Sequence, residues 1–338
     1  MSDDTNKLSR QIDPLLVQRA MELIAPAQRI ALLAHEHPDG DCIGSALGLT
    51  HILIQMGKAS IPVCADPAPK TLAFLPGVEM LQRTLGDEDY DLVIALDAGE
   101  LERFGPLYEQ HQAFLDSVPI LNIDHHISSS GCGIVNIIDP IAAATAELLV
   151  LFQQQASLPL NKEAAVCLLT GIITDTSSFQ FTNTTARTMD AAAVLLRAGA
   201  IPEPIVQHIY RSHPLAQVRF QARVIENAQV ACDGRLMWSY ATAATLAEAG
   251  ATPEMDDNFS GMMRDIEGVQ VAAFFKSYDE PGITRLSLRS AAPYNAAEIC
   301  QRFGGGGHAR AAGATIHAPL ETAIITVVNE LKKALGCT

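Results

Sequence analysis

Three apolar segments in the first half of the chain each end at acidic or histidine residues. They span residues 29–34, 91–96 and 119–123, and a fourth apolar run ends at Asp175. Because the carboxyl ends of parallel strands meet at one edge of an open α/β sheet, we expect the polar residues that follow to lie close together. Gathered carboxylates repel one another unless cations neutralise them. The pattern therefore predicts an α/β fold with a metal site at one edge of the sheet.

Apolar strands and helical segments alternate in the first part of the chain, which is typical of a doubly wound parallel sheet. Beyond about residue 140 the sequence becomes rich in alanine, and its spacing predicts helices at 141–155, 163–173 and 185–199. We therefore predict an α/β, metal-binding catalytic domain over residues 1–200.

The rest of the chain predicts a linker and a second domain. Residues 201–226 are expected to form a helical linker, because proline and glycine interrupt the helical pattern there. Residues 227–338 predict a smaller α+β domain. Its strands are expected near 236–240, 269–275, 283–290 and 311–316, and its helices near 295–302 and 319–335.

The charge of the chain limits the partners that it can bind. Its formal net charge is −15, of which residues 1–226 contribute −12 (14 basic and 26 acidic groups) and residues 227–338 contribute −3. Long duplex nucleic acid needs basic surfaces that neutralise its phosphates, so we do not expect it as a ligand. A short nucleotide or oligoribonucleotide held through metal ions is compatible with this charge.

Hydropathy and cysteine usage indicate the compartment. Apolar runs stay shorter than the ~20 residues that cross a bilayer, and the first residues are too polar for a signal peptide. The seven cysteines are scattered and include no Cys-x-x-Cys pair, so we expect reduced thiols without a catalytic role. These features predict a cytoplasmic protein with no membrane partner, and they leave a homodimer open.

The loop after residue 34 offers three metal ligands in a short space. His35, Asp39 and Asp41 are closely spaced, and Gly40 allows a sharp turn that directs the two carboxylates to different ions. Oxygen-rich sites with a few imidazoles suit Mn²⁺ or Mg²⁺ better than structural zinc, which favours thiolates. Asp97 stands alone at its strand end. We therefore predict that Asp97 bridges two metal ions, which would activate a hydroxide as the nucleophile.

Four short motifs carry the acidic and histidine residues. They are His35-x-x-Pro38-Asp39-Gly40-Asp41-x-x-Gly44-Ser45, the lone Asp97, Asp124-His125-His126, and Thr174-Asp175-Thr176. In composition and order they resemble the four motifs of the DHH phosphoesterase superfamily. The glycine-rich stretch over residues 303–313 resembles the motif of the DHH-associated C-terminal domain. One departure is Ser177, where the family often has glycine, and this difference could narrow the site.

The resemblance implies a role for each matching residue. The metal ligands would be His35, Asp39 and Asp97 for one ion, and Asp41, Asp97, His125 and Asp175 for the other. His126 would contact the scissile phosphate or the leaving oxygen, and Asp124 would orient an imidazole. The cofactor would be two divalent ions, most suitably Mn²⁺, with Mg²⁺ or Co²⁺ as alternatives.

The second domain offers a surface for the substrate. The predicted strand over 283–290 alternates, so that Arg285, Ser287 and Arg289 share one face. Successive glycines let a backbone approach a ligand closely and offer amide donors to a phosphate. Together with the resemblance, these features predict six substrate-binding residues, which are Arg289, Ser290, Gly305, Gly306, Gly307 and His308.

The resemblance is closest to the group that combines oligoribonuclease (nanoRNase) and 3′-phosphoadenosine 5′-phosphate (pAp) phosphatase activities. We therefore expect a metal-dependent phosphoesterase that hydrolyses short oligoribonucleotides, pAp, or both. Three alternatives stay open: a cyclic di-AMP or pApA phosphodiesterase, an inorganic pyrophosphatase or exopolyphosphatase, and a catalytically inactive nucleotide-binding sensor. The glycine-rich tail argues against a pyrophosphatase, and the intact Asp and His set argues against a sensor.

Overall fold

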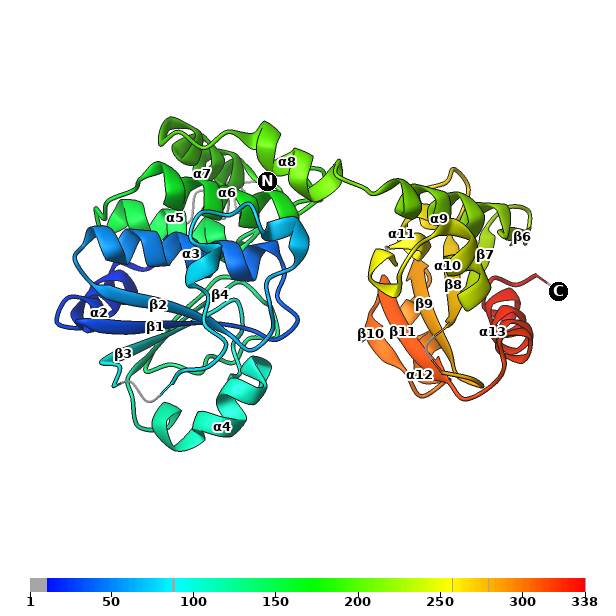
Figure 1. The fold of residues 1–338 in the computed structure, drawn as a ribbon, viewed down its shortest axis with the longest axis horizontal. Helices are drawn as coiled ribbons and strands as arrows, with labels where there is room; N and C mark the ends of the chain where they lie inside the picture. Colours follow the sequence, from blue (N-terminus) through cyan, green and yellow to red (C-terminus); the bar gives the residue numbers. More distant parts are fainter. Residues whose placement is uncertain (1–10, 87–88, 257, 279, 338) are drawn as a thin grey trace. The chain divides into compact units, whose positions relative to one another are not determined.

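The computed structural model (Figure 1) describes residues 11–86, 89–256, 258–278 and 280–337. The chain divides into two compact units, a first unit that ends at Ser212 and a second that begins at His213. Among the described helices, none is both long and apolar enough to cross a membrane.

The segment predicted as a helical linker, residues 201–226, is shared between the two units. Its first half forms α8 (Pro202–Tyr210), which packs on α6 in the first unit. Its second half forms α9 (Leu215–Glu226), which packs on α10 and β7 in the second unit. The helix is interrupted before Pro214, because a residue that precedes proline disfavours the α conformation. The first unit thus extends beyond residue 200.

The first unit contains the doubly wound parallel sheet that the sequence predicts. Its five strands are all parallel and lie in the order β2-β1-β3-β4-β5. They span Arg29–Ala34 (β1), Ala59–Cys64 (β2), Leu92–Leu96 (β3), Ile120–Asp124 (β4) and Val135–Ile138 (β5). The sequence does not predict β5, because only four residues are available to show a pattern and half of them are partly exposed.

Helices cover both faces of this sheet (Figure 1). One face carries α3 (Gly40–Gln55) and α5 (Thr145–Gln155), with α2 (Pro14–Ile24), α6 (Lys162–Asp175) and α7 (Ala186–Arg197) packed beside them. The other face carries α4 (Pro106–Leu115) and the short helix η3 (Leu101–Phe104). Two further short helices are η1 (Lys70–Leu72) and η2 (Val78–Met80). Buried side chains of β1 and β3 alternate between the two hydrophobic clusters, as expected for strands covered on both sides.

The backbones of α3 and α6 approach each other closely. Three glycines of α3 recur every four residues and so lie on one face of the helix: Gly40, Gly44 and Gly48. A Cβ atom at Gly44 would lie only 2.5 Å from the carbonyl oxygen of Cys167 in α6. The two helices run in opposite directions, so the first turn of α3 lies beside the last turn of α6. This packing brings Asp41 and Asp175 to the same end of the helix pair.

We expect Gly44→Ala to lower the free energy of unfolding by about 1–3 kcal/mol, because the added methyl group meets backbone atoms that cannot move aside. At Gly48 the nearest atoms belong to the Leu168 side chain, 2.7 Å from the added Cβ, and a side chain can change its rotamer. Gly48→Ala is therefore the matched control and should be the milder change. Urea unfolding measures both variants, and equal losses would contradict the close backbone contact.

The second unit is built on a mixed sheet in the order β10-β11-β9-β8-β7-β6, which confirms the predicted α+β class. The strands span Gln229–Ala231 (β6), Leu236–Thr242 (β7), Val271–Ser277 (β8), Thr284–Ser290 (β9), Gly306–His308 (β10) and Ala311–Ile316 (β11). β7 and β8 are parallel, and the other neighbours are antiparallel. Part of the glycine-rich run thus forms the edge strand β10.

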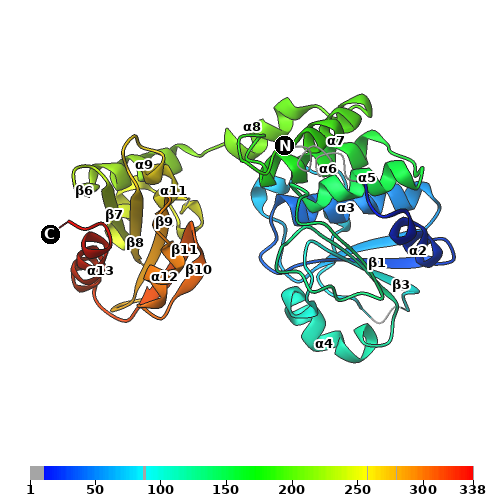
Figure 2. The same cartoon turned by 180° about the vertical axis from the view of Figure 1, so that it is seen from behind.

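Helices cover both faces of this sheet. α12 (Ala296–Gln301) and α13 (Leu320–Ala334) pack on the face that carries Leu288 and Val271. On the opposite face α9, α10 (Ala243–Ala249) and α11 (Phe259–Arg264) pack around Phe274. Helices α9 and α11 can be followed in Figure 2, and the short helix η4 (Pro253–Met255) lies between α10 and α11 in the chain. The edge strand β10 is exposed along its whole length.

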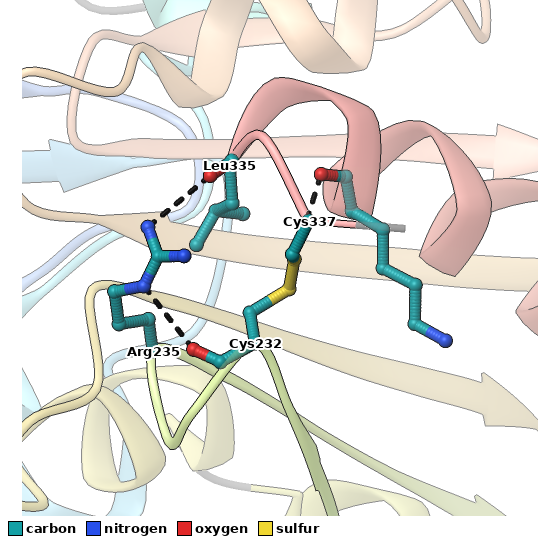
Figure 3. The surroundings of a disulfide bond; sticks show 5 residues. Cys232, Arg235, Leu335 and Cys337 are labelled. Carbon is teal, nitrogen blue, oxygen red and sulfur yellow. Dashed lines mark hydrogen bonds between the residues drawn. A yellow bond between two sulfur atoms is a disulfide. The ribbon is translucent and has the colours of Figure 1, made fainter.

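A disulfide joins Cys232 and Cys337 (Figure 3). Their Cα atoms lie 5.6 Å apart, although 105 positions separate them in the sequence. Arg235 supports the same corner, because its side chain donates to the carbonyl oxygens of Cys232 and Leu335, each at 3.1 Å. The expectation that all seven thiols are reduced is therefore wrong for this pair, which meets only in the folded unit. The free cysteines are Cys42, Cys64, Cys132, Cys167 and Cys300.

Candidate metal centre

Three neighbouring strands and two helix ends deliver the candidate ligands to one edge of the sheet. β1 is followed by His35, β3 by Asp97, and β4 ends one residue before His125. Because β1, β3 and β4 are adjacent and parallel, the residues at their carboxyl ends meet. Asp41 comes from the first turn of α3, and Asp175 from the last turn of α6.

Asp97 has an unusual backbone conformation. Its φ of +61° lies in the left-handed region, which is uncommon for residues other than glycine. The Asn122 side-chain amide holds this turn, since it donates to the carbonyl oxygens of Ala95 and Ala98 at 3.2 and 2.7 Å. Such conformations persist where the surrounding structure imposes them, and they cluster at functional sites. The backbone conformation therefore makes Asp97 a candidate functional residue.

The two carboxylate oxygens of Asp97 face different imidazoles. Asp97 Oδ2 lies 3.5 Å from His35 Nε2, and Asp97 Oδ1 lies 3.5 Å from His125 Nε2. His125 Nε2 also lies 3.3 Å from Asp175 Oδ2 and 3.9 Å from Asp41 Oδ2. The donor atoms thus form overlapping groups, and Asp97 belongs to two of them. A carboxylate shared in this way is what a bridge between two ions requires.

The imidazole rings of His35 and His125 are held so that Nε2 faces the carboxylates. His35 Nδ1 lies 2.7 Å from the Glu36 carbonyl oxygen, and His125 Nδ1 lies 3.3 Å from the Ala142 carbonyl oxygen. A carbonyl oxygen accepts only from a protonated Nδ1, so in the neutral ring the lone pair is on Nε2. Metal-binding histidines are commonly oriented in this way.

Asp41 is fully buried and accepts hydrogen bonds from the start of α5. The backbone N–H groups of Thr145 and Ala146 donate to its Oδ2 and Oδ1 at 2.6 and 3.0 Å, and the Ser45 hydroxyl donates to Oδ1 at 3.2 Å. The first N–H groups of a helix have no partner inside the helix and favour a nearby negative charge. Asp41 therefore caps α5, while the remaining lone pairs of its oxygens stay available for a cation.

Asp39 lies at the exposed N-cap of α3. Its Oδ1 accepts hydrogen bonds from the backbone N–H groups of Asp41 and Cys42 at 3.1 and 3.0 Å. Among the described residues, the tight groups of metal-binding atoms do not include Asp39. Its negative charge still lies near enough to add to the raised pKa of Asp97 and of Asp175, after burial and Asp41. Its role as a ligand stays a prediction.

Burial and mutual repulsion raise the pKa values of the gathered carboxyl groups. Burial raises the pKa of Asp97 well above its usual value, and the three neighbouring carboxylates raise it further. Burial, followed by the charges of Asp41 and Asp39, raises the pKa of Asp175 to about 9. Burial also raises the pKa of Asp41, although His125 opposes this shift. Divalent cations would displace the protons that these groups otherwise retain.

Asp124 and His126 form a separate pair beside the carboxylates. Asp124 is buried, and its Oδ1 lies 2.7 Å from His126 Nδ1. Burial alone would raise the pKa of Asp124, but the hydrogen bond from His126 is among the interactions that lower it. The same hydrogen bond raises the pKa of His126, whose ring is half-exposed and lies 3.8 Å from Asp97 Oδ1. His126 thus has a raised pKa and lies between solvent and the carboxylate group.

The structure adds Thr145, which the sequence interpretation missed, to the site. The helix predicted over 141–155 begins only at Thr145, because residues 140–143 form a turn and bends and Ala144 is extended. The Ala142 carbonyl oxygen in this segment faces His125 Nδ1. The Thr145 hydroxyl donates to Asp97 Oδ1 at 2.9 Å. In the sequence, Thr145 is visible only as a threonine that follows three alanines. Its role in the site can be recognised only once its contacts with Asp97 and Asp41 are known.

A buried ion pair holds the loop that carries Thr145. Glu147 is fully buried in the first turn of α5, and it pairs with Arg187 Nε of α7 at 2.5 Å. Arg187 also pairs with Asp139 at 2.8 Å, and Glu147 accepts from the Ala143 backbone N–H at 3.2 Å. Both ends of the loop are therefore tied to α7, which fixes the start of α5 against the candidate ligands.

We expect Thr145→Val to lower the catalytic rate and the apparent metal affinity about 10- to 100-fold, the range typical of residues that orient metal ligands. The valine keeps the shape but removes the hydrogen bond to Asp97, while Thr145→Ser keeps the hydroxyl and should restore most of the loss. Metal-activation curves measure both effects. Thr170→Val is the matched control, because it removes an equally buried hydroxyl that bonds only to the Val166 carbonyl oxygen. Equal losses in the two valine variants would contradict the assignment.

Cys42 lies beside the candidate ligands without the chemistry of a ligand. Its Sγ accepts a hydrogen bond from the His35 backbone N–H at 3.1 Å and groups with His35 and Asp97. Burial, and then the nearby carboxylates, raise the pKa of this thiol well above its usual value. Because a thiol must lose its proton to bind a metal, the raised pKa disfavours Cys42 as a ligand.

Ser177, where the related motif often has glycine, has a left-handed backbone conformation. Ser177 has a φ of +48°, and the next two residues, Ser178 and Phe179, are also left-handed. Glycine adopts this conformation freely, whereas other residues are strained there. The family preference for glycine at this position thus matches the turn that follows Asp175.

In the second unit, the predicted substrate-binding residues do not all lie on the same face of the sheet. Arg289 of β9 lies opposite Ala311 of β11, which lies opposite His308 of β10, so these residues share one face of the sheet. Ser290 belongs to the other face, where it is buried and its hydroxyl donates to the Tyr294 carbonyl oxygen at 2.9 Å. The glycines at 305, 306 and 307 lie in or beside the exposed strand β10. Ser290 is thus placed to hold the unit's interior rather than to reach a ligand on the exposed face.

Comparison with known proteins identifies the family. The DHH family, N-terminal domain, matches residues 29–172, and the DHHA1 domain matches residues 239–335. The bifunctional oligoribonuclease and PAP phosphatase NrnA of Thermus thermophilus is 34% identical over 292 residues, which cover 85% of this chain and 84% of that protein. The chain therefore belongs to the DHH family, as its motifs indicate.

Two further proteins extend the comparison. The cyclic-di-AMP phosphodiesterase PdeA of Listeria monocytogenes is 29% identical over 315 residues, which cover 87% of this chain and 46% of that longer protein. An exopolyphosphatase-related protein from Bacteroides fragilis has a solved structure with a TM-score of 0.87 and 23% identity, covering 97% of this chain and 100% of that one. This structural likeness confirms the fold.

Proposed function

We propose that this protein is a hydrolase of phosphoester bonds that acts, with two divalent metal ions, on short oligoribonucleotides and on pAp. The observation that carries the proposal is the Asp97 carboxylate, whose two oxygens face His35 and His125. The substrate class follows from relatives named bifunctional oligoribonuclease and PAP phosphatase, one of which matches over most of both chains.

The residues present fit divalent cations. Several carboxylates with raised pKa values surround two imidazoles whose Nε2 atoms face them, so positive charge is needed to hold the group together. The ions would be held by His35, Asp39 and Asp97 on one side, and by Asp41, Asp97, His125 and Asp175 on the other. Bound there, two such ions neutralise phosphate charge and lower the pKa of the attacking water. Oxygen and imidazole donors favour Mn²⁺, with Mg²⁺ or Co²⁺ as alternatives.

His126 is the proposed acid for the leaving group. Its Nδ1 is hydrogen-bonded to Asp124, which raises the pKa of the ring and so favours its charged form, and Nε2 would approach a phosphate or leaving oxygen. A positioned imidazolium can donate a proton to the oxygen that departs. Asp97, Asp124 and His126 would therefore form the catalytic group.

Arg289, His308 and the backbone amides of Gly305, Gly306 and Gly307 are proposed to bind the nucleotide end of the substrate. Arginine pairs well with phosphate oxygens, and backbone N–H groups of a glycine-rich segment can donate to them. Ser290 is left out, because its side chain is buried on the opposite face of the sheet.

A cyclic di-AMP or pApA phosphodiesterase is the second candidate function. The observation that favours it is the similarity to PdeA of Listeria monocytogenes. This chain matches 46% of the length of that protein. Pyrophosphate would not need the glycine-rich surface of a second unit, so we rank a pyrophosphatase lower. A sensor without activity would not need the carboxylates and imidazoles that gather around Asp97, so we rank a sensor lower as well.

One assay separates these functions. With Mn²⁺ present, we expect the purified protein to release mononucleotides from pApA and phosphate from pAp. Turnover of cyclic di-AMP at comparable rates would favour the second candidate, and phosphate release from pyrophosphate alone would favour a pyrophosphatase. Calorimetric binding of nucleotides without turnover would identify a sensor. If none of the nucleotides is hydrolysed, the proposal fails.

The remaining proposals concern location and assembly. We propose a cytoplasmic protein, because its substrates and five free thiols suit a reducing, nucleotide-rich compartment. A homodimer stays a prediction, and sedimentation of the purified chain would test it.

A further inference from the structure

Asn122 is a buried polar side chain in the middle of an apolar strand. In β4 it stands between Leu121 and Ile123, and all three side chains are fully buried. Ile120 belongs to the hydrophobic cluster that includes residues of α4, and Asn122 faces the same side because alternate residues of a strand share a face. Strands that are covered on both sides are normally continuous apolar runs, so an amide at this position needs a separate explanation.

The amide group of Asn122 reaches the backbone on both sides of Asp97. Its Nδ2 donates to the carbonyl oxygen of Ala95, the residue directly opposite on β3, at 3.2 Å, and to that of Ala98 at 2.7 Å. The backbone N–H of Asp97 itself donates to the Ile123 carbonyl oxygen at 3.0 Å. The pairing of β3 with β4 therefore extends to Asp97, and Asn122 closes the turn that begins there.

Only the donor half of this amide has partners. Among the residues that the structure describes, Asn122 Oδ1 has no hydrogen-bond partner, although the side chain is fully buried. A buried polar atom without a partner lowers stability, so asparagine is a poor choice for filling the core alone. Its contribution comes from the two hydrogen bonds that it donates, and both are made to the turn at Asp97.

The conformation of this turn sets the direction of the Asp97 carboxylate. Asp97 has a φ of +61°, a left-handed conformation that is unfavourable for a residue other than glycine. Without the Asn122 amide, the backbone would relax toward a negative φ, and rotation about the N–Cα bond would move the side chain. The two carboxylate oxygens lie 3.5 Å from His35 Nε2 and from His125 Nε2, and after such a rotation they would no longer face both rings.

We propose that Asn122 is a positioning residue of the metal centre and acts through Asp97. It holds the backbone in the conformation that lets one carboxylate serve both metal positions, and it needs no contact of its own with an ion or with substrate. This inference rests on the proposed two-metal function and deepens it, because it assigns the residue on which the orientation of the bridge depends.

Asn122→Leu tests this role through the metal ions themselves. Leucine is close to asparagine in shape but cannot donate a hydrogen bond. We expect the apparent Mn²⁺ affinity, measured by calorimetry, to fall about 10- to 100-fold, the range typical of residues that orient metal ligands. EPR at saturating Mn²⁺ is the second readout, because two ions that share a carboxylate are magnetically coupled, whereas separate ions give the hyperfine pattern of isolated Mn²⁺. The variant should lose the coupled spectrum.

Asn136→Leu is the matched control. Asn136 lies directly opposite Asn122 on β5, and its amide also holds a turn, since its Nδ2 donates to the Gly133 carbonyl oxygen at 2.7 Å and its Oδ1 accepts from the Gly133 N–H at 2.9 Å. This turn carries no candidate ligand. The control should therefore keep the Mn²⁺ affinity and the coupled spectrum, whatever its melting temperature in EDTA.

Each outcome decides between a positioning role and a merely structural one. If Asn122→Leu keeps both metal properties, or if Asn136→Leu loses them equally, the assignment is overturned. Asn122→Val, which also lacks donors and is smaller, should show the same losses as Asn122→Leu. Failure of both Asn122 variants to fold would show that the amide serves the core as a whole, and it would also overturn the assignment. If the wild-type protein itself gives no coupled spectrum, the proposed two-metal function is wrong.

Discussion

Asp97→Asn is expected to lower kcat/KM by more than about 100-fold towards every substrate, because it would remove the bridge between the two metal ions. The loss should exceed the 10- to 100-fold effects typical of residues that only orient ligands. Asparagine has the same shape, but it replaces one carboxylate oxygen with an NH2 group that cannot bind a cation. The two Asp97 oxygens face His35 and His125, so no single neighbour could replace it.

The same substitution should stabilise the protein in the absence of metal. Burial and neighbouring carboxylates raise the pKa of Asp97, so its charge destabilises the metal-free fold as the pH rises. Asp97→Asn should therefore raise the melting temperature in EDTA at alkaline pH while it removes activity. Asp116→Asn, at an exposed position after α4, is the matched control and should change neither quantity. Near-normal turnover of Asp97→Asn would refute the bridging role.

Removal of divalent metal should abolish activity and change how stability depends on pH. Asp41, Asp97 and Asp175 have raised pKa values in the fold, so the metal-free native state binds more protons than the unfolded chain. Their stabilising contribution is complete below the ordinary pKa of 3.8 and is lost as the pH rises toward about 9, the value for Asp175. Over this range the free energy of unfolding of the metal-free protein should fall steadily as the pH rises.

Bound metal should reverse this trend, because the ligands must be deprotonated and the ions then stabilise the charged form. We expect the difference in unfolding free energy between Mn²⁺-loaded and EDTA-treated protein to widen from pH 5 toward pH 9. Urea unfolding at several pH values measures this difference. Calorimetry in buffers of different ionisation enthalpy should detect protons released on metal binding. Parallel stability curves with and without metal would contradict the site.

Much of the site can be predicted from local sequence, because each ligand stands at the end of a recognisable element. His35, Asp97 and His125 each follow an apolar strand, and the rule that parallel strands end at one edge brings them together without knowledge of the loops. The class of both domains follows from the same alternation of strands and helices. The boundary between the units was less predictable, because α8 and α9 look alike in sequence and differ only in the unit on which they pack.

Residues that act through other residues could not be predicted in this way. Thr145 gains its role from Asp97 and Asp41, which are far away in the chain, and Glu147 gains its role from Arg187. The disulfide between Cys232 and Cys337 could not be predicted either, because 105 positions separate the two cysteines and they meet only in the folded unit. The glycines of α3 were visible as a four-residue repeat, but only the packing of α6 shows that they bring Asp41 and Asp175 together.

By itself, the sequence determined the α/β class of the first unit, the α+β class of the second, the order of the motifs and the identity of the candidate ligands, because strand periodicity and residue chemistry act locally. Only the tertiary structure decided which oxygen of Asp97 faces which imidazole, that Ser290 is buried, and that Asn122 donates to both Ala95 and Ala98. Those facts depend on register and on contacts between distant segments. A chain acquires such contacts when it folds, and no short stretch of residues carries them.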